Sequence, residues 1–119
     1  MFGFEKLEVW QKAVEYADFI YRATQSFPPD ERFGLTSQLR RSAVSVSSNI
    51  AEGSSRASKI DLARFIEIAY GSLLESVSEL EIAKRQGFLT GEMFATVYKK
   101  AEDVAKMLSG LRRTLKKRP

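Results

Sequence analysis

Residues 35–50 read LTSQLRRSAVSVSSNI, and whether this stretch forms a helix or a strand decides the fold class. Its middle part, residues 43–47, alternates between the two faces of an extended chain and contains β-branched valines, which is a strand pattern. An apolar stripe with helical spacing crosses the same residues and consists of Leu35, Leu39, Ala43, Val46 and Ile50. Because no other segment offers a partner strand, the sequence predicts a helix here.

Proline and glycine divide the rest of the chain into three more long segments with helical periodicity. The four predicted helices span residues 5–26, 36–53, 58–86 and 91–117. Ser58 with Asp61 three residues later forms an approximate capping box, and Thr90 supplies a helix-starting side chain. Short connections between helices of this length fit antiparallel neighbours. The predicted fold is therefore all-α, an antiparallel up-down four-helix bundle that forms a single domain over residues 1–119.

The chain has 119 residues and contains neither His nor Cys, which excludes several kinds of chemistry. Ser-His and Cys-His nucleophiles, the usual zinc and haem sites and disulfides all need one of these residues. No phosphate-binding glycine loop is present either. Glu75 and Glu79 are four residues apart, but no further carboxylates converge on them, so we expect a solvated or salt-bridged role. We predict no enzyme activity, no cofactor and no metal site.

No segment approaches the roughly 20 apolar residues that a membrane span requires. The first residues, Met1 to Glu5, lack the basic start and the hydrophobic core of a signal peptide. We therefore expect a cytoplasmic protein with no membrane partner.

The first predicted helix carries two apolar stripes, which together are wider than a helix in an isolated bundle needs. One stripe consists of Leu7, Trp10, Val14, Ala17 and Tyr21, and the other of Val9, Ala13, Tyr16, Ile20, Ala23 and Phe27. The second predicted helix also lacks charge between Arg41 and Glu52. We expect these two helices to meet other copies of the chain, through Val9, Ala13, Tyr16, Ile20, Val44, Ser47 and Ala51. The alternative is a monomer in which Phe2, Phe4 or the C-terminal tail covers the extra apolar surface.

A polar stripe follows one face of the second predicted helix, and Glu75 or Glu79 of the third is a further acceptor for Arg41. Its predicted members, the structural polar seam, are Gln38, Arg41, Asn49, Glu52 and Glu75, with Ser45 on the same face. A hydrogen-bonded seam of this kind fixes helix register or subunit orientation. The alternative is a ligand or phosphate surface in which Arg40 and Arg41 act as forked donors.

The C-terminal residues gather positive charge without an acidic neighbour, in a chain of formal charge +4. This basic tail consists of Arg112, Arg113, Lys116, Lys117 and Arg118. Clustered cations neutralise backbone phosphates and release counterions. The predicted nucleic-acid-binding residues are Arg40, Arg112, Arg113, Lys116 and Lys117. The alternative for the tail is a structural or solubility role, since cations at a helix C-terminus interact favourably with the helix dipole.

Four segments carry a resemblance to a known family. They are residues 4–13 (FEKLEVWQKA), the turn and helix start at 27–41, residues 48–53 (SNIAEG) and residues 68–75 of the third helix. This chain resembles the four-helix bundle proteins that are encoded in intervening sequences of bacterial 23S ribosomal RNA genes, the S23-like family. The resemblance implies an antiparallel four-helix bundle that assembles as a ring-shaped homopentamer, and gene location suggests ribosomal RNA as a ligand.

The chain is also similar, more loosely, to the accessory protein of diversity-generating retroelements. That likeness implies binding of nucleic acid and of a protein partner such as a reverse transcriptase through a basic ring surface. Taken together, we predict a non-enzymatic homo-oligomer, expected to be a pentamer, that binds RNA or DNA. The alternative is an oligomeric scaffold that docks a protein partner without significant nucleic-acid binding.

Overall fold

The structure is a computed structural model that describes residues 1–117. Its elements in chain order are η1 (Gly3–Lys6), α1 (Glu8–Thr24), η2 (Pro29–Glu31), α2 (Leu35–Ser54), α3 (Lys59–Arg85) and α4 (Gly91–Lys116). The ambiguous stretch 35–50 lies entirely within α2, because its apolar stripe packs against the other helices. Residues 1–117 contain no strand, and the predicted all-α fold is confirmed.

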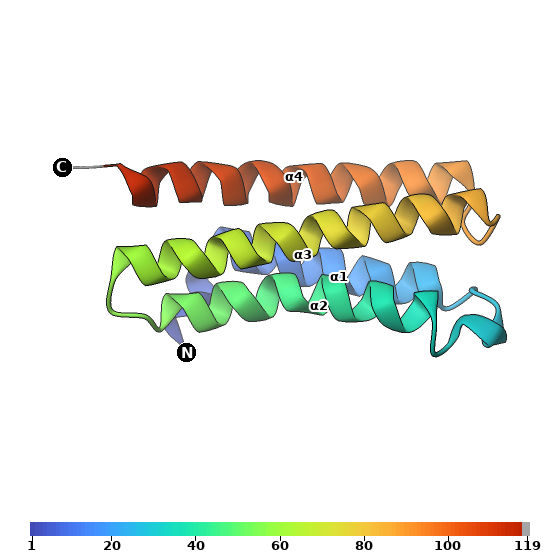
Figure 1. The fold of residues 1–119 in the computed structure, drawn as a ribbon, viewed down its shortest axis with the longest axis horizontal. Helices are drawn as coiled ribbons and strands as arrows, with labels where there is room; N and C mark the ends of the chain where they lie inside the picture. The colour runs from blue at the N-terminus through green and yellow to red at the C-terminus, as the bar shows by residue number, and fades with distance from the viewer. Residues whose placement is uncertain (118–119) are drawn as a thin grey trace.

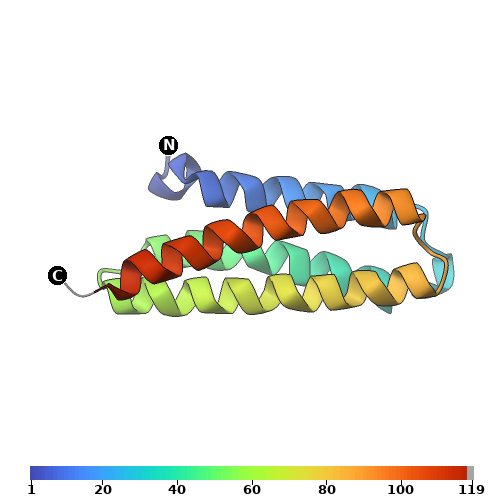
Figure 2. The ribbon, with the colours of Figure 1, turned by 90° about the horizontal axis from the view of Figure 1, so that it is seen from above.

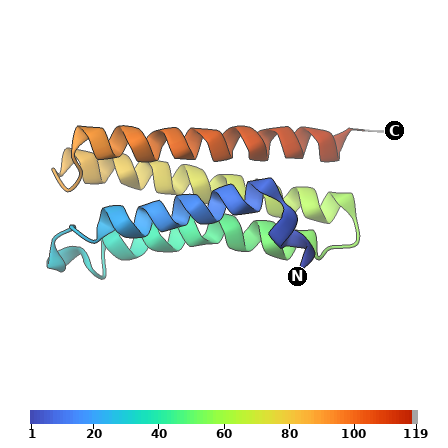
Figure 3. The same cartoon turned by 180° about the vertical axis from the view of Figure 1, so that it is seen from behind.

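The four helices form an antiparallel bundle, elongated to 49 × 23 × 21 Å (Figure 1). Around the bundle, α1 packs against α2 and α4, and α3 packs against the same two helices (Figure 2). One end holds η1, the α2–α3 turn and the last turn of α4, and we call it the terminal end (Figure 3). The opposite end holds the α1–α2 connection and the α3–α4 turn, and we call it the loop end. In the part that the structure describes, no helix combines the length and apolar character needed to cross a membrane.

The helix ends follow local capping chemistry. Ser58 Oγ accepts a hydrogen bond from the Asp61 amide at 3.1 Å at the start of α3, as the capping box predicts. Thr90 Oγ1 accepts one from the Met93 amide at 3.0 Å at the start of α4. At the end of α3, Gly87 has a φ of +78°, which glycine adopts without steric cost and which lets the chain turn sharply into α4.

The first helix starts three residues later than predicted. Leu7 has an extended backbone, with φ −77° and ψ 123°, and the residues before it form η1 instead of helix. Glu5 Oε1 accepts a hydrogen bond from the Phe2 amide at 2.8 Å, which closes this short turn. The ring of Phe4 packs edge-on against Trp10, with ring centroids 5.0 Å apart. Phe4 therefore covers part of the extra apolar surface of α1, as the monomer alternative expects, while Phe2 remains exposed.

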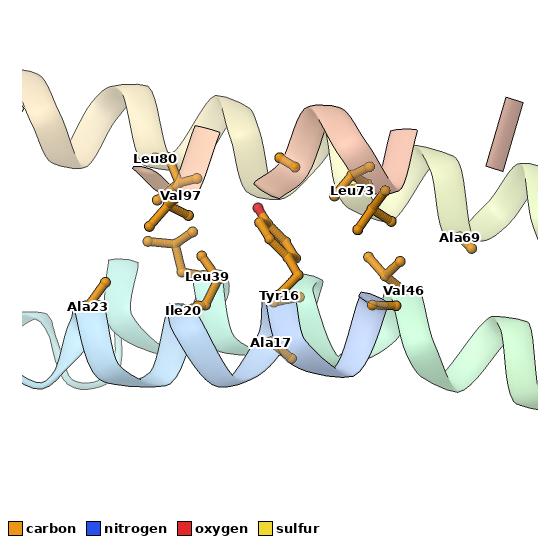
Figure 4. Close-up of a cluster of buried hydrophobic side chains, with 14 of the residues drawn as sticks. Tyr16, Ala17, Ile20, Ala23, Leu39, Val46, Ala69, Leu73, Leu80 and Val97 are labelled. Atoms are coloured by element: carbon orange, nitrogen blue, oxygen red, sulfur yellow. The ribbon is translucent and has the colours of Figure 1, made fainter. Parts of the chain in front are cut away.

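The core is a layer of aliphatic side chains crossed by one buried tyrosine (Figure 4). The hydroxyl of Tyr16 on α1 reaches Ser76 Oγ on α3, at 2.6 Å, diagonally across the bundle. Ser76 in turn donates to the Leu73 carbonyl at 2.7 Å, so the buried polar atoms are satisfied. Burial raises the pKa of Tyr16 to about 12, because the charged phenolate is poorly solvated there.

Candidate nucleic-acid interface

The described cations of the basic tail, Arg112 to Lys117, lie at the end of α4 at the terminal end. Lys116 Nζ pairs with Glu67 on α3 at 2.5 Å, and the Arg112 guanidinium lies 5.7 Å from the centre of the Tyr70 ring. The hydrogen bond from Lys116 and its charge lower the pKa of Glu67. Within residues 1–117, Arg112, Arg113 and Lys117 make no ion pair. Three cations of the tail thus remain available to an external anion, and Arg118 lies outside the described residues.

Beside the tail is a hollow of about 610 Å³ between α3 and α4. Arg64, Lys116 and Lys117 provide its positive charge, and Glu67 its one negative charge. Ile60 lies at its edge and is 83% exposed. The charged side chains around this hollow are therefore mainly cationic, three against one.

Arg40 lies far from the tail, at the loop end of the bundle. It belongs to the second turn of α2, whereas Arg112 to Lys117 lie at the far end of α4, a helix of about 39 Å at the usual rise per residue. The structure therefore does not bring the five predicted nucleic-acid-binding residues together on one surface. It divides them into a tail site at one end and Arg40 at the other.

Three contacts with α1 hold the guanidinium of Arg40 in place. Its Nε–H donates to Thr24 Oγ1 at 2.8 Å, and its Nη2 donates to the Tyr21 carbonyl at 3.4 Å. The guanidinium carbon also lies 4.6 Å from the centre of the Tyr21 ring, in a cation–π contact. The Arg40 side chain is consequently fixed, which lowers the entropy cost of binding an anion.

Arg40 borders a second hollow, of about 440 Å³, which we call the loop-end hollow. Its lining includes Tyr21, Arg32, Phe33, Thr36, Arg40 and Arg41. Sequence reasoning missed Tyr21, Thr24, Arg32 and Phe33 as site residues. The available signal was the FPPDERFG connection at residues 27–34, which places an aromatic residue next to an arginine in a loop.

The polar seam is not a buried network within the chain. Gln38, Arg41, Glu52 and Glu75 are exposed. Among the described residues, Glu52 pairs only with Arg56, at 3.3 Å. Asn49 is half-buried and donates back to the carbonyl of residue 45 on its own helix. A single interhelical bond remains on this face, between Ser45 and Ser72 at 2.9 Å.

The predicted partner of Arg41 on α3 is bonded elsewhere. Glu79 is 6% exposed and accepts a hydrogen bond from Ser42 at 2.8 Å, so the neighbouring residue replaces Arg41 as donor. Burial raises the pKa of Glu79; the Ser42 bond opposes this shift and the nearby Glu75 charge adds to it. The prediction of an Arg41 network with α3 is corrected, because the rotation of α2 turns Ser42 inward and Arg41 outward.

Four of the predicted oligomer-interface residues lie inside the chain's own core. Val9, Ala13, Tyr16 and Ile20 are between 0 and 7% exposed, so they have no surface to offer a second copy. The other stripe of α1 is the more exposed one: Leu7, Val14 and Tyr21 are 37–42% exposed. Two of its members still belong inside, because Ala17 is 8% exposed and Trp10 packs half-buried against the core. On α2, Val44 is exposed at 39%, and Ser47 and Ala51 are half-buried. The two-stripe observation was right, but the stripes were assigned to the wrong sides.

Among the described residues, no group of three or more His, Cys, Asp or Glu side chains is arranged to hold a metal ion. Glu75 and Glu79 differ in environment, one exposed and one buried, and do not form a paired carboxylate site.

Comparison with known proteins places the chain in a family. Residues 5–110 match the model of the 23S rRNA-intervening sequence protein family. The fold is similar to the crystal structure of a protein of unknown function from the S23 ribosomal protein family of Bacteroides thetaiotaomicron, with a TM-score of 0.79. The two are 24% identical over 87% of this chain and 97% of that chain. No curated protein matches the sequence. The family match spans most of the chain, and the chain therefore belongs to the 23S rRNA-intervening sequence protein family.

Proposed function

We propose that this protein is a non-enzymatic, homo-oligomeric bundle that binds RNA or DNA through its exposed basic side chains. The observation that carries the proposal is that Arg112, Arg113 and Lys117 lie together at one end of the bundle with no ion-pair partner in residues 1–117. Arg113 and Lys117 are exposed, and Arg112 is half-buried beside Tyr70. Arginine binds phosphate in a forked, bidentate geometry, and clustered cations gain affinity by releasing counterions. The family name refers to 23S rRNA, which makes RNA the first nucleic acid to test.

The proposed assembly rests on the exposed apolar side chains of α1 and α2. Leu7, Val14, Tyr21 and Val44 are each 37–42% exposed, and apolar side chains gathered on adjoining helices favour contact with another protein surface. Several copies in one particle multiply the basic tails, so that weak individual sites bind one nucleic acid together. The pentameric state comes from the family resemblance. Light scattering at micromolar concentration tests it, and a monomeric mass refutes it.

The binding test is a titration of labelled single-stranded and duplex RNA at several salt concentrations. If the three unpaired cations of one tail each neutralise one phosphate, log K falls against log[salt] with a slope of about −2 for a single strand. A chain that binds no RNA or DNA at low salt refutes the proposal. The test variant replaces the four described tail cations with glutamine: Arg112→Gln, Arg113→Gln, Lys116→Gln and Lys117→Gln.

A matched control separates a local site from a general charge effect. It removes the same number of positive charges from exposed ion pairs elsewhere on the bundle: Lys12→Gln, Arg22→Gln, Arg85→Gln and Lys99→Gln. Exposed pairs of this kind contribute little to stability, so the control is expected to fold. The tail variant is expected to lose more affinity than the control and to keep its oligomeric mass. Equal losses in the two variants contradict a binding site at the tail.

The second candidate function is a scaffold that docks a protein partner. It is favoured by an apolar hollow of about 700 Å³ at the terminal end, where Phe2, Phe4, Leu7, Ile50 and Leu111 contribute to the lining. Phe2 is 73% exposed there, so the hollow is open to a partner's side chains. This function predicts that Phe2→Ala abolishes partner binding while the basic tail variants have no effect.

A further inference from the structure

The loop-end hollow has a composition that the tail site lacks. It combines three arginines, Arg32, Arg40 and Arg41, with two aromatic rings, Tyr21 and Phe33, around one space of about 440 Å³. The tail hollow, in contrast, has cations and aliphatic side chains but no aromatic lining. The two ends of the bundle are therefore built to contact different chemical groups.

The arginines of the loop-end hollow are not neutralised within the chain. Arg32, Arg40 and Arg41 make no ion pair in residues 1–117. Glu31, next to Arg32 in the chain, accepts a hydrogen bond from the Leu35 amide at 3.1 Å at the start of α2 instead of pairing with one of these arginines. The hollow thus carries a surplus of positive charge that attracts an anion.

Arg40 differs from Arg32 and Arg41 in that its guanidinium hydrogen-bonds to α1. Of its five N–H groups, one is bonded to Thr24 Oγ1 and one to the Tyr21 carbonyl, which leaves three for an external acceptor. Thr24 is 3% exposed, and its own hydroxyl donates to the Ile20 carbonyl at 2.8 Å, so its lone pairs face Arg40. Thr24 is therefore a positioning residue for a guanidinium whose remaining donors are free.

Phe33 is the aromatic side chain most exposed to solvent at this end, at 87%. The Phe33 side chain is not part of the core. The guanidinium carbon of Arg32 lies 5.2 Å from the centre of the Phe33 ring, in a cation–π contact. An exposed ring next to phosphate-binding arginines is the arrangement on which unpaired bases stack in single-strand-binding proteins. Bases inside a duplex are already stacked and paired, so they are not accessible to such a ring.

We propose that the loop-end hollow binds one nucleotide of a single-stranded RNA or DNA, with the phosphate on Arg40 and Arg41 and the base stacked on Phe33. The proposal deepens the proposed nucleic-acid binding and rests on it. The basic tail then supplies affinity that does not depend on strandedness, and the loop-end hollow supplies the preference for single strands. The two ends of the bundle have separate roles in binding.

The test compares the affinities for a single-stranded and a duplex RNA of the same sequence. Stacking of one base on an aromatic ring is worth about 1 kcal/mol or more, so Phe33→Ala is expected to weaken single-strand binding about fivefold or more. Binding of the duplex is expected to stay unchanged. The matched control is Tyr98→Ala, which removes a partly exposed ring of α4 that lines neither the tail hollow nor the loop-end hollow, and it is expected to leave both affinities unchanged.

Two variants test the arginine. Arg40→Lys keeps the charge but removes the fork, and Thr24→Val removes the acceptor that orients it while leaving the net charge unchanged. Both are expected to weaken single-strand binding and to keep the salt slope of the duplex. Circular dichroism shows whether the Thr24→Val chain is folded. Arg40 is half-buried, so Arg40→Lys tests the role of the guanidinium without changing the buried Thr24.

The outcomes separate the two proposals. If the wild-type chain binds no nucleic acid, the proposed function fails. If it binds RNA but Phe33→Ala and Arg40→Lys bind single strands as tightly as the wild type, nucleic-acid binding stands and this inference is overturned. If the loop-end hollow binds a protein segment instead of a nucleotide, Phe33→Ala and Arg40→Lys also leave the single-strand affinity unchanged, and this inference is overturned.

Discussion

Gly53, near the end of α2, offers a quantitative test of how closely α2 and α3 approach each other. A Cβ added to this buried residue lies 2.6 Å from Cβ of Phe65 and 3.2 Å from Cδ1 of Leu62. Phe65 Cβ is attached directly to the backbone of α3, so it cannot rotate away. Gly53→Ala therefore forces the two helices apart.

The magnitude follows from two opposing terms. Carbon atoms pack best at about 3.5–4.0 Å, so the new methyl group is about 1 Å too close. Overpacking of this kind costs about 1–3 kcal/mol, and a contact with a backbone-anchored atom belongs near the upper limit. Alanine regains up to about 1 kcal/mol of helix propensity over glycine. We expect Gly53→Ala to lower the free energy of unfolding by about 2 kcal/mol.

The assay is urea unfolding followed by circular dichroism, at one protein concentration for all variants because assembly shifts apparent stability. Gly71→Ala is the matched control. It makes the same chemical change inside α3, where an added Cβ meets nothing within 4 Å, so it is expected to raise the free energy of unfolding by up to about 1 kcal/mol. If Gly53→Ala is as stable as Gly71→Ala, the close approach of α2 and α3 is wrong.

Three further changes have defined outcomes. Tyr16→Phe is expected to lower the free energy of unfolding by about 1 kcal/mol, because it removes the bond to Ser76 but leaves no buried donor unpaired. It is also expected to remove the part of the wild type's stability loss above about pH 10 that comes from Tyr16, since burial raises the folded pKa of Tyr16 to about 12. Glu79→Gln raises the free energy of unfolding at pH 7, because burial raises the folded pKa and disfavours the charged form; the gain vanishes below about pH 4.5. Glu67→Gln releases Lys116 and is expected to steepen the single-strand salt slope by up to about 0.7, one phosphate contact.

Each of these has a result that contradicts it. A Tyr16→Phe chain as stable as the wild type means that the diagonal bond is not formed. A Glu79→Gln chain whose stability advantage is the same at pH 4 and pH 7 means that the carboxyl is not desolvated. An unchanged salt slope for Glu67→Gln means that Lys116 does not contact the nucleic acid.

Local chemistry explains why the fold class and the helix ends were predictable. The caps at Ser58 and Thr90 use contacts to residues three positions away, and the end of α3 depends on the backbone freedom of Gly87. Both partners of such an interaction lie within a few residues of each other, so the local sequence is enough to predict it. The later start of α1 accompanies the η1 turn, in which Phe4 packs against Trp10 six residues further along the chain. Helical periodicity alone does not predict that turn.

The candidate sites were predictable only in part, because they combine residues from different helices. The tail is continuous in sequence, and its cations were identified directly. The orientation of Arg40 depends on Thr24, sixteen residues earlier on α1, and no spacing rule within one helix relates the two. The ion pair of Lys116 with Glu67 likewise joins helices whose relative register is set by packing of the whole bundle.

By itself, the sequence determined that the chain is all-α, where its four helices lie and that α1 has two apolar stripes. Only the tertiary structure decided which stripe faces inward. Both stripes have the right spacing for a core. In the folded chain α1 has a single orientation about its own axis, and its packing against α2 and α4 buries the stripe that contains Tyr16 and Ile20. The orientation of α2 about its axis likewise brings Ser42, and not Arg41, to Glu79. The periodicity of apolar residues shows that a helix has an apolar face. Whether that face points into the core depends on how the neighbouring helices pack.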